Sequence, residues 1–412
     1  MAIYKYLLIT IVSISLSVSS FGNSTSSSNT VESSSPAPHS YKSMPSSASR
    51  SRVTWGSSNY HISRNIQTQD YYINYQNNLK IHLREKKPLA NPNHKVVILL
   101  APLSIPSLIS FDISKYSLMD TLAQNGFDVW GVDFIGQGTS SYPLEMQNNP
   151  SPECLPTGCP LQASDAVLQL ESIVDFINSQ AKTQKNTRNK AVSILGWSWG
   201  SVVASMYAIK HPKNVDRLVL FGAMYGFVLP KPVARIFLGP YTSPSDHTKF
   251  SNHMLAYQNV RWEMIRGHWF VMMDGNESIV SRETVDDVGR AYIKADPNAV
   301  ITQRDTVDIL ANPNLSSSTK INGSLRRATG PMKDLFAIWT NHPIYDISKL
   351  TTPTLVIYGD QDLFADTALF GKLTHVKIKK EVKLHEATHW LLYEKTRPTF
   401  NKEVINFLSA NH

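Results

Sequence analysis

The sequence predicts an α/β protein whose mostly parallel central sheet carries helices on both faces and whose chain contains an inserted helical cap. Three observations lead to this fold class. Apolar, strand-like runs alternate with helix-patterned segments before residue 222 and again after residue 345. Residues 223–345 read instead as helices and loops without that alternation. The sharp-turn pattern Gly196-Trp197-Ser198-Trp199-Gly200 joins a strand to a helix. We therefore expect a core formed by 61–222 and 346–412, with 223–345 as the cap.

The first core segment owes its predicted strands to apolar runs and its helices to apolar residues spaced three or four apart. Lys95 to Ala101 is nearly continuously apolar and is followed by Pro102, which is typical of a central parallel strand. A helix over 117–125 is expected to end at Gly126. The elements expected here are a hairpin over 71–75 and 79–84, strands over 95–101, 127–133, 191–195 and 217–221, and helices over 117–125, 163–180 and 201–211.

The second core segment is shorter and repeats the same pattern. Strands are expected over 353–358 and near 377–384, and a last helix over about 398–408. Lysines alternate with apolar residues in 377–383, which indicates the polar side of a strand. Hydrophobic residues make up 42% of the chain, enough for a sizeable core.

The N-terminal residues predict export. Lys5 precedes an apolar run from Tyr6 to Val18, and small residues follow around Phe21, so residues 1–22 are expected to be a signal peptide cleaved after Gly22. The alternative is a membrane anchor, but the run is shorter than the roughly 20 residues of a span. Residues 23–60 are rich in serine and proline and are expected to be a disordered linker. The mature protein is therefore expected to be periplasmic or secreted.

Charge and cysteine content limit the classes of binding partner that the chain can have. The formal charge is +8, but without a block of like charges, which argues against nucleic-acid binding and allows only a weak attraction to anionic membrane surfaces. Cys154 and Cys159 are the two cysteines of the chain, and in an exported protein they are expected to form a local disulfide. Two cysteines without neighbouring histidines make a poor zinc site.

A serine acts as a nucleophile only when a base removes its proton and a third group holds the base. Ser198 lies at the sharp turn, and an acid and a histidine follow it at the ends of later strands. Asp360 and Asp362 come directly after the strand 353–358, and His389 follows the last strand. The order Ser, Asp, His along the chain is the one expected for a serine hydrolase of this architecture.

On these residues the chain resembles the α/β-hydrolase superfamily, in the branch with a helical cap between the sixth and seventh strands. The resemblance covers about residues 70–410, firmly in the two core segments and thinly in the cap. The matching pieces are Gly126-Phe127-Asp128-Val129-Trp130, Asp133-Phe134-Ile135-Gly136-Gln137-Gly138-Thr139-Ser140, Gly196–Gly200, Pro353–Asp362 and His389-Trp390.

The resemblance implies Ser198 as nucleophile, His389 as general base and Asp362 as the acid that orients it, with Asp360 as the alternative acid. It implies no cofactor. The family usually has His-Gly after its third strand, whereas this chain has Ala101-Pro102-Leu103. The backbone N–H groups of Leu103 and Trp199 are the implied oxyanion hole, and Pro102 fixes the backbone beside it.

A competing motif overlaps the histidine. His385-Glu386-Ala387-Thr388-His389 satisfies H-E-x-x-H, which binds zinc when one helix presents both histidines. Residues 376–384 alternate like a strand, which argues against that helix, so His385 and Glu386 are expected at the surface. Asp133 is expected to be a structural residue at a strand end, and Arg326-Arg327 a solvated pair.

The sequence thus predicts an exported hydrolase of a small-molecule or lipid ester. The cap's aromatic residues and methionines favour an apolar substrate, although such residues also form ordinary cores. Three alternatives stay open: a C–C bond hydrolase with the same triad, a catalytically weak binding protein whose oxyanion hole Pro102 has spoiled, and, remotely, a zinc peptidase.

Overall fold

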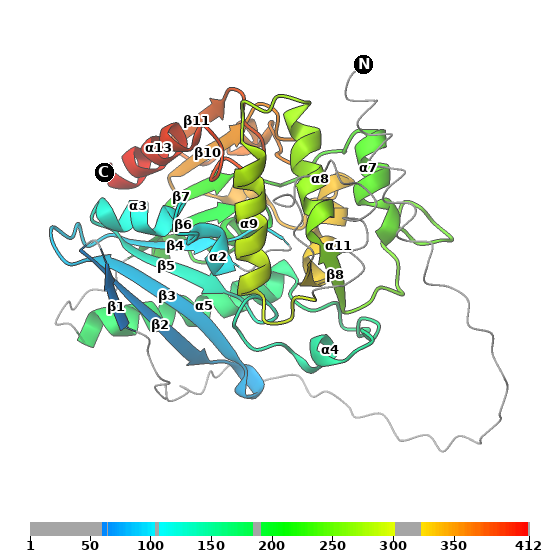
Figure 1. Ribbon diagram of the computed structural model, residues 1–412, viewed down its shortest axis with the longest axis horizontal. Coiled ribbons are helices and arrows are strands. Elements are labelled where there is room, and N and C mark those ends of the chain that lie inside the picture. The colour runs from blue at the N-terminus through cyan, green and yellow to red at the C-terminus, as the bar shows by residue number, and fades with distance from the viewer. Residues whose placement is uncertain (1–59, 64, 104–106, 184–190, 301–322, 411–412) are drawn as a thin grey trace.

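The computed structural model describes residues 60–63, 65–103, 107–183, 191–300 and 323–410 (Figure 1). The signal peptide predicted for 1–22 lies outside these residues, as does the linker predicted for 23–60 except for Tyr60, which begins the first strand. In the part of the chain that is described, no helix has both the length and the apolar character that a bilayer crossing requires.

Nine strands of the described residues form one central sheet. The first four in spatial order pair antiparallel, and from β5 onward all neighbours are parallel. Listed across the sheet they are β1 (Tyr60–Ser63), β2 (Ile66–Asn74), β3 (Lys80–Pro88), β5 (Asp128–Asp133), β4 (Val96–Leu100), β6 (Val192–Trp197), β7 (Val215–Phe221), β10 (Thr354–Gly359) and β11 (Lys379–Leu384). The predicted mostly parallel sheet is confirmed.

Alternate residues of the strands feed two separate apolar layers, one on each face of the sheet. In β4, Ile98 and Leu100 belong to one buried cluster, while Val97 and Leu99 belong to the other. The first layer is covered by α5 (Ala163–Thr183) and α6 (Trp199–Lys210), and the second by α3 (Leu118–Gln124) and α13 (Arg397–Ser409) (Figure 1). Period-2 alternation in fully buried strands therefore explains why helices are needed on both faces.

Several short helices complete the fold. They are α2 (Ser107–Phe111), α4 (Leu144–Gln147), α12 (Leu369–Lys372) and 3-10 turns at Gln76–Asn78, Pro212–Asn214, Gly239–Tyr241 and Ile347–Lys349.

The two cysteines pair as a disulfide, Cys154–Cys159, with an S–S length of 2.09 Å. The Cys154 N–H also donates to the carbonyl of Met254, 2.7 Å away, so this loop is fastened to the inserted segment.

The inserted segment lies between β7 and β10. Counted from β2, where the predicted hairpin begins, these are the sixth and seventh strands; β1 is an additional edge strand. The segment contains α7 (Lys231–Phe237), β8 (Tyr257–Arg261), α8 (Trp262–Met273), α9 (Arg282–Ala295), β9 (Ser324–Ala328) and α11 (Gly330–Trp339). It is helical as predicted, apart from the two-stranded sheet β8–β9. That sheet was not expected because its strands are mostly polar.

The interpretation of Arg326-Arg327 as a solvated pair is wrong. Arg327 is buried, and its guanidinium donates to the side-chain oxygens of Tyr241 and Gln258. Arg326 lies over the ring of Tyr257, 4.2 Å from its centroid. Both arginines belong to β9, and as successive residues of a strand they face opposite sides of the β8–β9 sheet, where each has its own partners.

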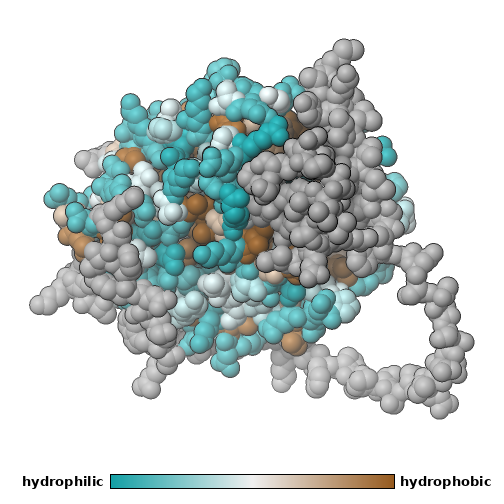
Figure 2. All heavy atoms as spheres, viewed as in Figure 1, coloured by the Kyte–Doolittle hydropathy of each residue, from teal (hydrophilic) through white to brown (hydrophobic). Residues whose placement is uncertain are grey.

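The inserted segment packs directly on the core. Trp262 and Trp269 of α8 share one buried cluster with Trp197 of β6, and Trp339 of α11 shares the other with Trp199. On the face shown in Figure 2, hydrophilic residues predominate and hydrophobic residues reach the surface in small groups between them. The large aromatic residues of the segment are therefore used mainly inside the molecule.

Candidate active site

Ser198 is the single residue between β6 and α6, and its backbone is held in an unusual conformation. Its φ of 58° and ψ of −122° lie outside the regions that most residues adopt. The Ser198 N–H donates to the Phe221 carbonyl at 2.8 Å. A Cβ on Gly196 would lie 2.4 Å from the Gly200 oxygen, and one on Gly200 would lie 2.3 Å from the Leu100 oxygen. Both flanking glycines are therefore required by close backbone contacts.

His389 and Asp362 form a buried hydrogen-bonded pair. Nδ1 of His389 lies 2.7 Å from Oδ2 of Asp362. The other carboxylate oxygen, Oδ1, accepts the backbone N–H groups of Phe364 at 2.9 Å and Ala365 at 3.1 Å. The His389 carbonyl accepts the Trp197 indole N–H at 3.0 Å. The acid is thus fixed at the end of β10, and the histidine is fixed to the strand that carries Ser198.

Gly222, directly after β7, leaves room for this pair. Its φ is +52°, and a Cβ there would lie 2.8 Å from Cε1 of His389 and 3.0 Å from Oδ2 of Asp362. The Ser198 hydroxyl itself is hydrogen-bonded to Sδ of Met224, 3.7 Å away, rather than to His389. Hydrogen bonds between catalytic groups are often made only once substrate is bound. The three predicted residues therefore follow the carboxyl ends of β6, β10 and β11, and Gly222 at the end of β7 lies against two of them.

The two candidate acids have separate partners. Asp360 lies 2.6 Å from Nδ1 of His385, whose side chain is 87% exposed. Asp362, not Asp360, faces His389. Residues 385–389 form no helix and Glu386 has a positive φ of 50°, so the two histidines are not presented by one helical turn. The geometry that H-E-x-x-H requires for zinc is not present.

The expected oxyanion donors flank the elbow. Trp199 is the first residue of α6, where the helix leaves its backbone N–H unused. The end of β4 lies directly against the elbow, as the Gly200 contact with the Leu100 oxygen shows, and Leu103 follows three residues later. Residues 104–106, next to Leu103, lie outside the described residues.

A second buried carboxylate, that of Glu394, holds the loop that carries His389. Glu394 accepts the Thr388 N–H at 2.9 Å, the Thr388 hydroxyl, and the indole N–H of Trp269 at 2.8 Å. Burial raises the pKa of Glu394 to about 7, despite these hydrogen bonds, and the charge of Asp362 adds to that effect. Since Trp269 belongs to α8, the inserted segment and the histidine loop share one carboxylate.

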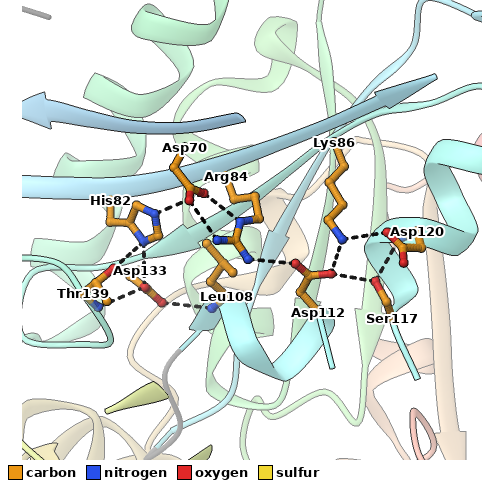
Figure 3. A network of polar contacts seen from close by, with 10 residues as sticks. All are labelled: Asp70, His82, Arg84, Lys86, Leu108, Asp112, Ser117, Asp120, Asp133 and Thr139. Carbon is orange, nitrogen blue, oxygen red and sulfur yellow. Dashed lines mark hydrogen bonds and ion pairs between the residues drawn. The ribbon is translucent and has the colours of Figure 1, made fainter. Parts of the chain in front are cut away.

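A buried polar network connects β2, β3 and the end of β5 (Figure 3). Asp133, at the end of β5, accepts the N–H groups of Leu108 at 2.9 Å and Thr139 at 3.2 Å. Its Oδ2 lies 3.1 Å from Nδ1 of His82, whose Nε2 lies 3.4 Å from Asp70. Burial disfavours the charged imidazole, but these two carboxylates outweigh it and raise the pKa of His82 to about 9. These contacts are the ones expected of a structural residue at a strand end.

Four aromatic rings from separate elements extend from His389 into the inserted segment. The Phe364 ring lies 5.3 Å from His389 and contacts Trp339 at 5.4 Å and Phe237 at 4.8 Å between centroids. His268 of α8 lies 4.3 Å from Phe237. Enclosure among these rings, with the charge of Arg327, lowers the pKa of His268 to about 3, so this imidazole is neutral.

Sequence reasoning did not identify Gly222, Met224, Glu394 or Asp334 as parts of this site; the Asp334 carboxylate accepts the indole N–H of Trp199 at 2.9 Å. A glycine directly after a strand was a usable signal for Gly222, since βα connections at a sheet end often need one. The other three carry no local motif. They reach the site because of which strands and helices become neighbours.

The comparisons with known proteins agree with this architecture. Residues 109–257 match the family model described as alpha/beta hydrolase fold. A "putative proline iminopeptidase" of Mycoplasma genitalium is 32% identical over 102 residues. That match spans 24% of this chain and 32% of the relative, so the chain aligns with about a third of the relative's length.

Solved structures with similar chains include a 2-hydroxy-6-oxo-6-phenylhexa-2,4-dienoate hydrolase from Rhodococcus sp. strain RHA1, with 16% identity, a TM-score of 0.49, and 84% of this chain and 100% of that chain covered. A thioesterase domain from the curacin biosynthetic pathway has 13% identity, a TM-score of 0.48 and coverage of 83% and 99%. Such distant similarities leave substrate and reaction undefined. With the family-model match over residues 109–257, the strand order and the elbow between β6 and α6, the chain has the α/β-hydrolase fold.

Proposed function

We propose that the protein is an exported serine hydrolase that cleaves a carboxylic ester of a small or lipid-like apolar compound through an acyl-enzyme. The observation that carries the proposal is the 2.7 Å contact between His389 and Asp362, placed beside the elbow that presents Ser198. Nucleophile, base and orienting acid are the three parts such a reaction requires.

In the proposed reaction, Oγ of Ser198 attacks the ester carbonyl while Nε2 of His389 takes its proton. The same nitrogen then protonates the leaving alcohol, and in the second half it activates the water that releases the acid. Asp362 holds Nδ1–H and stabilises the imidazolium. The reaction needs no cofactor.

The backbone N–H groups of Trp199 and Leu103 are proposed to hold the oxyanion. Helix α6 adds the positive end of its dipole at the same point, since its first residue follows the nucleophile. Loss of one such donor costs roughly 10²–10³ in turnover in a measured case, so a distorted Leu103 would slow this enzyme rather than abolish its activity.

Apolar substrates are supported by what surrounds the histidine. Phe364 contacts His389, and Phe237, Trp339 and the neutral His268 continue that aromatic surface into the inserted segment. Met224 lies against the Ser198 hydroxyl. Rings and a thioether of this kind bind hydrocarbon and aryl groups better than charged ones.

Export is proposed from residues 1–22 and is supported by the disulfide Cys154–Cys159, which is typical of oxidising compartments. We place the mature enzyme in the periplasm or outside the cell. Its positive charge supports a weak attraction to anionic membrane surfaces.

The test is hydrolysis of aryl esters of increasing acyl length by wild type and Ser198→Ala, each with and without a chelator. We expect turnover by wild type, unaffected by the chelator, and a loss of at least about 10³-fold in Ser198→Ala. A fluorophosphonate should label wild type and not the variant.

Each alternative has its own outcome in this experiment. Activity that survives Ser198→Ala contradicts the serine mechanism, and loss on chelation supports a metallopeptidase. Labelling of Ser198 without ester turnover would indicate that the same triad cleaves another kind of bond. A prolyl arylamide is therefore added to the substrates, because one relative is a putative proline iminopeptidase. A protein that is neither active nor labelled is the binding protein.

A further inference from the structure

Asp334 joins the inserted segment to the residue that follows the nucleophile. It lies on α11 and is 4% exposed. Its Oδ2 accepts the indole N–H of Trp199 at 2.9 Å and the backbone N–H of Ala163, the first residue of α5, at 2.7 Å. One carboxylate oxygen therefore connects α11, α5 and the start of α6.

Helix α11 is itself held in register at this contact. The N–H of Gly330, its first residue, donates to the Pro160 carbonyl at 2.9 Å. Asp334 follows one turn later and meets Ala163. The helix is thus fixed on the 160–163 segment at two points, and Trp199 is held by the second of them.

A purely stabilising role fits Asp334 poorly. Among the described residues, no Lys, Arg or His forms an ion pair with it. Burial raises its pKa to about 7, and Asp165 nearby acts in the same direction. A buried carboxylate without a cationic partner lowers the stability of the fold. What the carboxylate contributes is its hydrogen bonds, and one of them goes to Trp199.

We propose that Asp334 is a positioning residue: by holding the Trp199 side chain, it sets the place of the Trp199 backbone N–H and of Ser198 beside it. The inference rests on the proposed function, in which that N–H binds the oxyanion. A displacement of about 1 Å in such a donor is enough to cost on the order of 10²-fold in rate.

Three variants test the contact from both ends. Asp334→Leu removes the acceptor at similar volume, Asp334→Asn keeps an acceptor oxygen, and Trp199→Phe removes the indole N–H while keeping the backbone N–H. We expect kcat on an aryl ester and the rate of fluorophosphonate labelling to fall on the order of tenfold in Asp334→Leu and Trp199→Phe, with KM nearly unchanged. Asp334→Asn should retain most of both rates.

Asp296 supplies the matched control. It is 5% exposed, follows α9 in the inserted segment and accepts backbone N–H groups from Asn298 and Arg326, both at 2.8 Å. It also accepts the Tyr142 hydroxyl of the core at 3.4 Å, but it does not touch the elbow. Asp296→Leu should lower Tm as Asp334→Leu does and leave the rates of the folded protein unchanged.

The double variant Asp334→Leu/Trp199→Phe decides between positioning and general loosening. If the two residues act through their shared hydrogen bond, the double variant is about as slow as either single one. Multiplying losses, equal slowing by Asp296→Leu, or full rates in Asp334→Leu would each overturn the inference.

A readout without turnover separates this inference from the proposed function. The indole ¹⁵N–H resonance of Trp199, assigned as the one lost in Trp199→Phe, should shift in both Asp334 variants. An unshifted resonance overturns the inference even in an active enzyme. An inactive and unlabelled wild type contradicts the proposed function, and with it the positioning role, even if the resonance shifts.

Discussion

Gly222 is the residue at which His389 and Asp362 leave least room for another atom. In Gly222→Ala, the new methyl carbon would lie within 3.0 Å of both partners, so the pair would have to separate or tilt. We expect kcat to fall on the order of 10- to 100-fold, because a base displaced by a fraction of an ångström transfers protons poorly. Steady-state kinetics on an aryl ester measure this.

Gly275→Ala is the control for backbone strain. Gly275 also has a positive φ, +81°, but a Cβ there would meet nothing within 4 Å. Both variants should lose stability by about 1 kcal/mol or more from strain, and only Gly222→Ala should lose activity. Equal kcat values in the two variants would mean that Gly222 matters for the fold alone.

The candidate triad could be predicted from the sequence because each member lies in a local pattern. Ser198 lies between glycines, and Asp362 was preferred to Asp360 on the G-x-x-D spacing of the family that the chain resembles; the contact with His389 supports this choice. Asp334 and Arg327 carry no such pattern. Their surroundings are set by long-range packing, which is why Arg327 was placed at the surface and is buried.

At the scale of elements, the loop after β11 that carries His389 is held by hydrogen bonds between Thr388 and Glu394. Thr388 immediately precedes the histidine, and Glu394 accepts both its N–H and its hydroxyl. In Glu394→Gln, the amide NH₂ would face a donor, so one of these hydrogen bonds is lost. We expect a fall in kcat on the order of tenfold, measured with aryl esters, with less effect on KM.

Glu381→Gln is the comparison for that variant. Glu381, on β11, accepts the Tyr358 hydroxyl at 3.1 Å and does not contact the histidine loop. It should keep the wild-type kcat. If Glu394→Gln also keeps the wild-type kcat, the loop positions His389 without help from the Glu394 carboxylate.

Elements differ in how well the sequence reveals them. The parallel strands were predicted because both of their faces are buried, which produces continuous apolar runs such as Val97 to Leu100. The pair β8–β9 was missed because its residues are polar and its two strands are far apart in the chain. The elbow proved tighter than expected: β6 continues to Trp197 and α6 begins at Trp199.

For the whole molecule, Asp334 and Glu394 predict how stability changes with pH. The pKa of each is raised to about 7, from 3.8 and 4.5, chiefly by burial. Between about pH 4 and pH 7 the folded protein therefore holds protons that the unfolded chain has lost, so the free energy of unfolding falls as pH rises. The combined effect is on the order of a few kcal/mol.

The variant Asp334→Asn/Glu394→Gln should flatten this part of the pH profile. Denaturant unfolding of wild type and variant at pH 5 and at pH 7.5 gives the two slopes. The variant should lose less stability over this interval than wild type, whatever its absolute stability. Parallel slopes would show that these carboxyls titrate near their ordinary values in the folded protein.

The two carboxylate–indole contacts, Asp334 with Trp199 and Glu394 with Trp269, tie the inserted segment to opposite sides of the reaction centre. It follows that the segment cannot lift without releasing the elbow and the histidine loop together. Substrate exchange and bond cleavage would then alternate in time. Under the proposed function, an enzyme of this build would be slower while the segment is open, because each of the two contacts is expected to change the rate about tenfold.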